Sequence, residues 1–306
     1  MNTLVDSIKT WMEQYKRNSV KPTTYDRLET SLKALTGYDI AQMDICDITT
    51  EDLQDFINSM VTNGYALTTI KKQYHLVTSY LKFANTEGII SRPVYNNVKL
   101  PKQQAVKKKK REVLGYSRPD QVALKRVLRT LERPCYAAAL LMMETGLRVG
   151  ECLALTWDDI LWERRALRVD KTLIRITNRR RMEVQEGAKS YTSNRTIPLS
   201  TDAQLLLDDL LTKAVDPHGY IFADDDGKPM SYEAIRYQIQ LACDEAKVPY
   251  KGQHVFRHTF ATNCYNRGCD VKILSKLLGH ADVSVTYNVY IHLFGDALEE
   301  MRSVVG

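Results

Sequence analysis

Five side chains in this sequence have the types and spacing needed to act on a phosphodiester. Arg148 lies in the middle of the chain, and His254, Arg257, His280 and Tyr290 follow one another near its C-terminal end. A phosphodiester under attack gathers negative charge on its non-bridging oxygens, and two guanidiniums can bind those oxygens bidentately. A tyrosine hydroxyl beside them can act as the nucleophile. The set therefore predicts the transfer of a phosphoryl group from a phosphodiester to a tyrosine.

In their order and spacing, these residues resemble the tyrosine recombinases, the family of phage and transposon integrases and Xer-type resolvases. The resemblance extends over nearly the whole chain. Its motifs are a His-x-x-Arg-His box at 254–258, a Leu-Gly-His box at 278–280 and a tyrosine ten residues later. The segment 189–199 looks like the lysine-bearing β-hairpin of the family. Val255-Phe256 stands where many members carry Asp-Leu, a departure that removes no residue of the chemistry.

The resemblance implies a role for each residue of the phosphate-binding set. Arg148 and Arg257 are expected to clamp the scissile phosphate. His254 is expected to hydrogen-bond the same phosphate and to help manage the tyrosine proton. His280 completes the pre-placed polar groups that polarise the phosphate. Taken alone, Arg148 and Glu151 also have the spacing of an ordinary surface ion pair, and His280 could be a capping or core histidine.

Lys189 and Tyr290 are expected to carry the proton transfer and the covalent step. Lys189 lies six residues before Arg195 and matches the family's catalytic lysine, which protonates the leaving 5′-oxygen. Without the resemblance, Lys189 would be interpreted as a solvated lysine in a turn. Tyr290 is the expected nucleophile, because its distance along the chain from His280 matches that of the family's catalytic tyrosine. Tyr287 lies one helical turn earlier and is its competitor.

No metal and no other cofactor is expected. His254 and His258 have a spacing that zinc sites also use, but no glutamate completes a His-Glu-x-x-His motif and Arg257 would repel a cation. The sequence offers no acidic cluster arranged for magnesium. The resemblance implies that a 3′-phosphotyrosine keeps the energy of the broken bond, so no nucleotide is needed.

The net charge of +6 is concentrated in one short segment. Five of the basic residues form an uninterrupted run, and the rest of the chain is close to neutral. We expect this run to contact DNA where the chain crosses the phosphate backbone, although a solvated hinge is the other interpretation. The run consists of Lys107, Lys108, Lys109, Lys110 and Arg111.

Composition favours a cytoplasmic protein without a membrane segment. No run of eighteen apolar residues is present, and the N-terminus lacks the pattern of a signal peptide. The six cysteines are scattered and form no Cys-x-x-Cys pair, which indicates reduced thiols.

Hydrophobic periodicity predicts a mainly α protein with a small antiparallel β-sheet in its C-terminal domain. We expect an N-terminal all-α helical bundle over 1–100 that binds the core DNA site, a basic linker over 101–111, and a C-terminal α+β tyrosine-recombinase catalytic domain over 112–306. Helices are expected at 4–15, 24–35, 50–62, 68–85, 120–131, 135–144, 202–215, 231–247, 254–266, 270–278 and 282–290, and strands near 167–169, 173–176 and 195–199.

The expected partners are double-stranded DNA at specific recombination sites, copies of the same chain, and DNA-bending accessory proteins. An apolar stripe at helical spacing in 297–305 resembles the tails that family members dock onto a neighbouring protomer in a tetramer. No arm-binding domain precedes the first helices, which fits a simple-site recombinase, a Xer-like resolvase or a chain that has lost that domain. The integrase branch is the favoured interpretation. A type IB topoisomerase and a non-catalytic DNA-binding regulator are the interpretations outside it.

Overall fold

The computed structural model describes residues 2–102, 115–130, 134–176, 181–187 and 194–290, apart from the side chains of Arg181 and of residues 288–290. The chain divides into two compact units, Met1–Arg111 with Arg175–Arg181, and Glu112–Ile174 with Met182–Gly306. No described helix is both long and apolar enough to cross a membrane. The predictions for Lys189 and for the basic run 107–111 lie outside the described residues.

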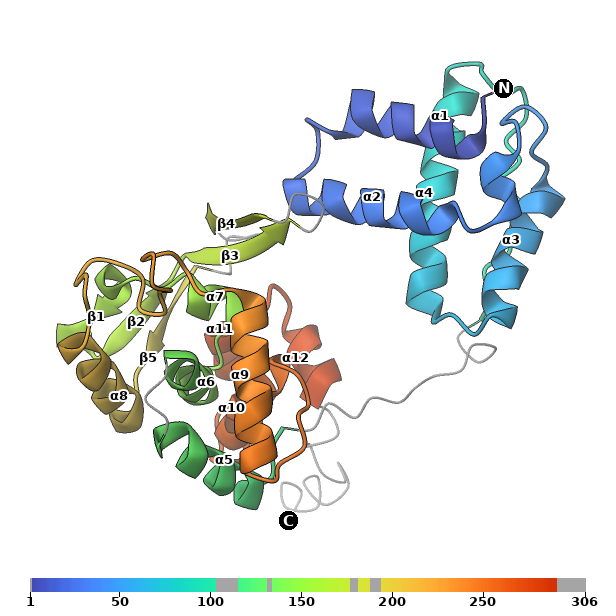
Figure 1. The fold of residues 1–306 in the computed structure, drawn as a ribbon. Coiled ribbons are helices and arrows are strands. Elements are labelled where there is room, and N and C mark those ends of the chain that lie inside the picture. The colour runs from blue at the N-terminus through green and yellow to red at the C-terminus, as the bar shows by residue number, and fades with distance from the viewer. Residues whose placement is uncertain (1, 103–114, 131–133, 177–180, 188–193, 291–306) are drawn as a thin grey trace, which may run out of the picture. The chain divides into compact units, whose positions relative to one another are not determined.

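The first unit is helical, as the periodicity predicts. Its core is formed by the apolar faces of the helices, for example Leu4, Ile8 and Trp11 of the first. Thr49 and Asp52 form a capping box at the start of α3, in which each side chain accepts a hydrogen bond from the other residue's backbone N–H. The helices are α1 (Leu4–Trp11), continued by a π-helical turn (Met12–Lys16), then α2 (Pro22–Leu35), α3 (Thr50–Thr62) and α4 (Leu67–Thr86) (Figure 1).

The second unit is built around one apolar helix, α6 (Pro134–Thr145). Every residue from Cys135 to Met143 is buried, so the helix has no solvent face. It packs against α5, α8, α9 and α10, which surround it in Figure 1. These are α5 (Arg118–Thr130), α8 (Thr201–Thr212), α9 (Tyr232–Glu245) and α10 (His254–Asn266), while α7 (Val149–Leu153), α11 (Val271–Leu278) and α12 (Val283–Tyr290) complete the unit.

Two small sheets accompany these helices. The strands β1 (Ile160–Leu161), β2 (Ala166–Val169) and β5 (Arg195–Pro198) form an antiparallel sheet in the order β1-β2-β5. Leu167 of β2 lies opposite both Ile160 and Ile197, and all three side chains are buried. The strands β3 (Lys171–Ile176) and β4 (Arg181–Glu186) form the second sheet.

Residues 189–193 of the expected hairpin over 189–199 lie outside the described residues. β5 pairs with β2, and β4 pairs with β3. The apolar contact between Ile197 and Leu167 fixes β5 beside β2, whereas β4 belongs to the other sheet. No hydrophobic pattern in the sequence predicts the polar strand β4.

Candidate active site

The turn between α6 and α7 places Arg148. Gly146 ends α6 with a φ of +69°, and its N–H donates to the Met142 carbonyl at 3.0 Å. A Cβ at Gly146 would lie 2.4 Å from Cδ1 of Phe260, so a larger residue would displace that ring. Arg148 follows in an extended conformation as the N-cap residue of α7. Its side chain is 37% exposed, so the guanidinium is accessible to a ligand.

Glu151, one turn into α7, binds two arginines. It accepts hydrogen bonds from the backbone N–H of Arg148 at 2.9 Å and from Nη1 of Arg148 at 2.7 Å. Arg195 donates to both of its carboxylate oxygens, Nη1 at 3.1 Å and Nη2 at 2.8 Å. Burial by itself raises the pKa of Glu151, but the hydrogen bonds and charge of Arg195, together with Arg148, lower it to about 2. The carboxylate is therefore ionised at any physiological pH and holds Arg148 in place.

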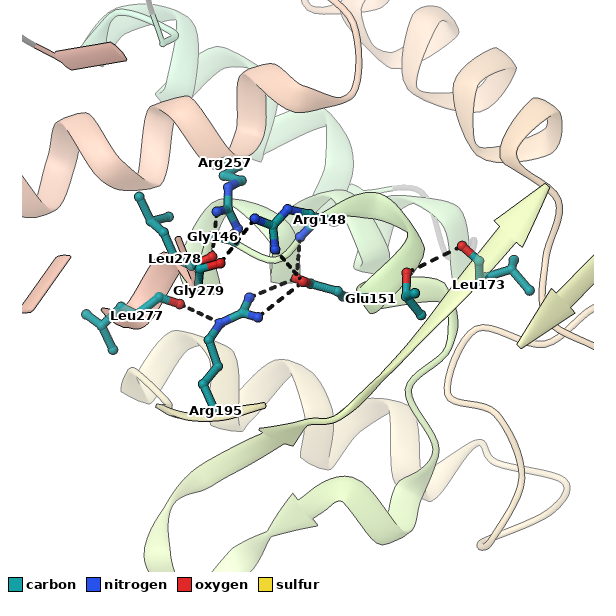
Figure 2. Close-up of polar contacts among 10 residues, drawn as sticks. Gly146, Arg148, Glu151, Leu173, Arg195, Arg257, Leu277, Leu278 and Gly279 are labelled. Carbon is teal, nitrogen blue, oxygen red and sulfur yellow. Dashed lines mark hydrogen bonds and ion pairs between the residues drawn. The ribbon is translucent and has the colours of Figure 1, made fainter. Parts of the chain in front are cut away.

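Three arginines converge on the C-terminal end of α11 (Figure 2). The carbonyl of Leu277 accepts from Nε of Arg195 at 2.7 Å, and the carbonyl of Gly279 accepts from Nη2 of Arg148 at 3.3 Å. Between them, the carbonyl of Leu278 accepts from Nη2 of Arg257. The last carbonyls of a helix lack partners within the helix and carry the negative end of its dipole. The end of α11 is therefore a natural anchor for cationic side chains.

Arg257 is the more deeply buried of the two predicted clamp arginines. It lies one turn into α10 and is 6% exposed. Its Nη1 donates to the carbonyl of Gly146 at 2.9 Å, so it ties the end of α6 to the end of α11. Arg148 and Arg257 thus share the α11 terminus through the adjacent carbonyls of Gly279 and Leu278.

His280 is presented by the turn that ends α11. Gly279 adopts a φ of +65° as the C-cap, and His280 follows it directly. Nδ1 of His280 lies 2.8 Å from Oγ1 of the buried Thr286, and this contact fixes the orientation of the ring. Burial and the charges of Arg257 and Arg148 lower the pKa of His280 to about 4. The imidazole is therefore neutral at pH 7.

His254 is the first residue of α10 and lies three residues before Arg257. Desolvation and the charges of Arg257 and Arg148 lower its pKa, although the side chain retains an exposed surface. Two neutral imidazoles therefore stand near two guanidiniums. Such a group can bind an oxyanion through charge, and its histidines can donate or accept a proton.

The structure brings some of the predicted site residues together, whereas others lie outside its described part. The structure brings Arg148, Arg257 and His280 together at one helix end, with His254 within their electrostatic reach. Tyr290 is the last residue of α12, but its side chain is outside the described part. The same holds for all of Lys189. Tyr287, the competitor of Tyr290 as nucleophile, has an exposed side chain.

In the sequence, Arg195 was considered only for its spacing from Lys189, and the place of Arg195 in this cluster was not predicted. A signal was present in the alternation of β5. Ile197 and Leu199 are buried while Thr196 and Pro198 are exposed, so the period of two puts Arg195 on the inward face. An arginine on the inward face needs a buried acceptor, and Glu151 supplies it.

Comparisons with known sequences agree with the resemblance. The profile of the Phage integrase family matches residues 119–296, and that of the phage integrase N-terminal SAM-like domain matches residues 3–61. A tyrosine recombinase XerC-like protein of Caldanaerobacter subterraneus subsp. tengcongensis is 27% identical over 95% of this chain and 79% of its own length. The transposase from transposon Tn916 of Enterococcus faecalis is 26% identical over 94% of this chain and 75% of its own length.

Solved structures have the same fold. The Tn1549 transposon integrase, in complex with transposon right end DNA, superposes with a TM-score of 0.79 at 20% identity, covering 99% of this chain and 100% of that one. A lambda integrase dimer bound to a COC′ core site gives a TM-score of 0.70 at 20% identity, covering 94% of this chain and 77% of that one.

Proposed function

The chain belongs to the phage integrase family, and from this membership we propose a role for each residue of its active site. It is a tyrosine recombinase, an enzyme that breaks and rejoins DNA strands. The observation that carries the assignment of the site is the convergence of Arg148 and Arg257 on adjacent carbonyls at the end of α11, beside His280. The scissile phosphate is bound there.

In this proposal, Arg148 is the main phosphate ligand because its guanidinium is partly exposed, while the buried Arg257 adds charge from beneath. Thr286 holds Nδ1 of His280, so Nε2 is the nitrogen that faces the phosphate. His254, also neutral, hydrogen-bonds the phosphate and takes up the proton of the attacking phenol.

Tyr290 attacks the phosphorus and forms a 3′-phosphotyrosine, while the bond to the 5′-oxygen breaks. Lys189 donates a proton to that oxygen, which leaves as a 5′-hydroxyl. Attack of a 5′-hydroxyl from another strand on the phosphotyrosine then restores the phosphodiester and frees the phenol. Neither step consumes a nucleotide, and no metal is required for the charge that the guanidiniums supply.

A nicked suicide duplex tests the proposal. The duplex is taken from DNA flanking the gene. The nick lies close to the cleavage site, so the short fragment that carries the new 5′-hydroxyl diffuses away and the covalent complex accumulates. We expect a protein–DNA adduct that survives boiling in detergent with the wild-type chain and with Tyr287→Phe, but not with Tyr290→Phe. An adduct that persists in Tyr290→Phe and is lost in Tyr287→Phe would reassign the nucleophile.

The same preparation separates the alternatives in reaction outcome. A recombinase that integrates or excises joins two different sites, whereas a Xer-like resolvase acts on paired simple sites, an alternative favoured by the XerC-like relative. A type IB topoisomerase would relax supercoiled DNA as a monomer without exchanging partners. Product analysis on plasmids that carry one or two copies of the site distinguishes the three outcomes.

We further propose that the chain acts on double-stranded DNA as a tetramer on two duplexes, with Lys107, Lys108, Lys109, Lys110 and Arg111 on the DNA backbone. DNA complexes of the Tn1549 integrase and a lambda integrase tetramer bound to a Holliday junction support this assembly. The apolar stripe in 297–305 docks onto a neighbouring protomer, and accessory proteins bend the DNA. Deleting 296–306 should weaken synapsis more than single-site binding; an equal loss of both would contradict the exchange of tails.

A further inference from the structure

Arg195 is held entirely by groups of the protein. Only 6% of its side chain is exposed. Nε donates to the carbonyl of Leu277, and both terminal nitrogens donate to Glu151. In this respect Arg195 differs from Arg148, whose side chain is 37% exposed and whose guanidinium can reach a ligand.

The groups that hold Arg195 are the supports of two proposed catalytic residues. Glu151 orients Arg148 through its backbone and its guanidinium. The end of α11 precedes His280, and the guanidinium of Arg195 packs against the bare Cα of Gly279. A Cβ at Gly279 would lie only 2.9 Å from Nη1 of Arg195. Arg195 therefore touches both supports at once.

A purely stabilising ion pair is the simpler interpretation, and the neighbouring strand provides an example. Arg168 of β2 pairs with Asp159 and Asp170, and it is 49% exposed. Burying a guanidinium as deeply as Arg195 costs much more desolvation, and buried ion pairs are often no more stabilising than apolar side chains of similar volume. Stability alone therefore gives a poor account of Arg195, whereas fixing two ligands of one phosphate requires its planar, forked donor group.

We propose that Arg195 is a positioning residue for strand cleavage, an inference that rests on the function proposed above. It presses Glu151 against Arg148 and fixes the turn that carries His280, so that both groups meet the same phosphate. Because Arg195 also begins β5, six residues after Lys189, it anchors the end of the segment that bears the proposed acid.

Three variants test the proposal: Arg195→Met, Arg195→Lys, and Arg168→Met as a matched control on the adjacent strand. The rate of adduct formation is measured with saturating enzyme on the nicked duplex, beside the affinity for the same DNA. We expect Arg195→Met to slow cleavage on the order of 100-fold at nearly unchanged affinity, because misplacement by about 1 Å has such an effect. Arg195→Lys keeps the charge without the fork and should restore the rate only in part. Arg168→Met should cleave at the wild-type rate.

A second readout does not depend on DNA. Among the described residues, the charged and titratable groups that act on His280 are Arg257 and His258 of α10, Arg148 before α7, and Arg195 of β5. Removing the positive charge of Arg195 favours the imidazolium, so the pKa of His280, followed by NMR titration, should rise in Arg195→Met. It should stay close to the wild-type value in Arg195→Lys and in Arg168→Met.

The outcomes separate this proposal from the proposed function. A folded Arg195→Met that cleaves at the wild-type rate with an unchanged His280 titration would overturn the positioning role. If Arg195→Met does not fold, Arg195→Lys decides, and wild-type cleavage or failure to fold in that variant too would leave Arg195 a stability residue. An absent adduct with the wild-type chain, despite the expected His280 shift, would refute the recombinase assignment of the site and leave the coupling of Arg195 to His280 intact.

Discussion

Two buried carboxylates of the second unit arise from the same local pattern but serve different surroundings. Glu151 and Asp159 are each three residues beyond an N-cap, and each accepts the N-cap's backbone N–H at 2.9 Å. At Asp159 the N-cap is Thr156, whose hydroxyl donates to the same carboxylate. At Glu151 the N-cap is Arg148, so the capping pattern holds a cation there instead of a neutral hydroxyl.

The second partners differ as well. Asp159 is paired with Arg168 and Lys171, at 3.3 Å and 2.8 Å, and these pairs join elements of the sheet region. Glu151 is paired with Arg195, which also binds the end of α11. A capping carboxylate can therefore support a candidate active site when its cations are shared with a second element.

The largest difference should appear when the arginine partners are removed. Arg148→Met takes away the partly exposed guanidinium that we propose binds the developing charge, and we expect the cleavage rate to fall roughly 10²–10³-fold. Arg168→Met removes the corresponding partner of Asp159 and should leave the rate unchanged. Single-turnover adduct formation measures both, and similar losses in the two variants would contradict the functional distinction.

The next largest difference in cleavage rate is expected when the two carboxylates themselves are replaced. In Glu151→Gln, Arg148 and Arg195 lose their common anion, and a displacement of Arg148 should slow cleavage on the order of 100-fold. Asp159→Asn leaves the cluster at α11 intact, so its rate should be that of the wild-type chain once corrected for the folded fraction. Urea unfolding followed by circular dichroism provides that correction. A cleavage defect that follows the loss of stability in both variants would refute the distinction.

Acid should reveal the ionic character that the two carboxylates share. The pKa of Glu151 is lowered from 4.5 to about 2, so its contribution to stability is present above pH 4.5 and is lost as the pH falls toward 2. The pKa of Asp159 is also lowered: burial opposes this, and Lys171 and Thr156 outweigh it. Between pH 7 and pH 2, we expect Glu151→Gln to lose about 2–3 kcal/mol less free energy of unfolding than the wild-type chain. Urea midpoints between pH 2 and pH 7 test this, and a curve parallel to the wild-type curve would contradict it.

Sequence alone was enough for the architecture, because it depends on local signals. The 3.6-residue period located the helices, and the boxes around His254 and His280 predicted the residues that we propose as ligands of the phosphate. The anchoring of these ligands could not be predicted, since it depends on carbonyls that no side-chain pattern encodes. Arg195 and the end of α11 are separated by more than eighty residues, and only the pairing of β5 with β2 brings them together.

The smallest effect expected is at the glycine that lets the cluster close. In Gly279→Ala, a left-handed backbone costs about 1–2 kcal/mol, and the new Cβ also displaces the guanidinium of Arg195. Gly252→Ala carries the same backbone strain at a φ of +87°, but no atom lies within 4 Å of its Cβ. Both variants should lose similar stability in urea, whereas only Gly279→Ala should slow cleavage, by roughly tenfold for a displacement of a fraction of an ångström. Equal cleavage rates in the two alanine variants would show that the close approach of Arg195 to Gly279 has no part in placing His280.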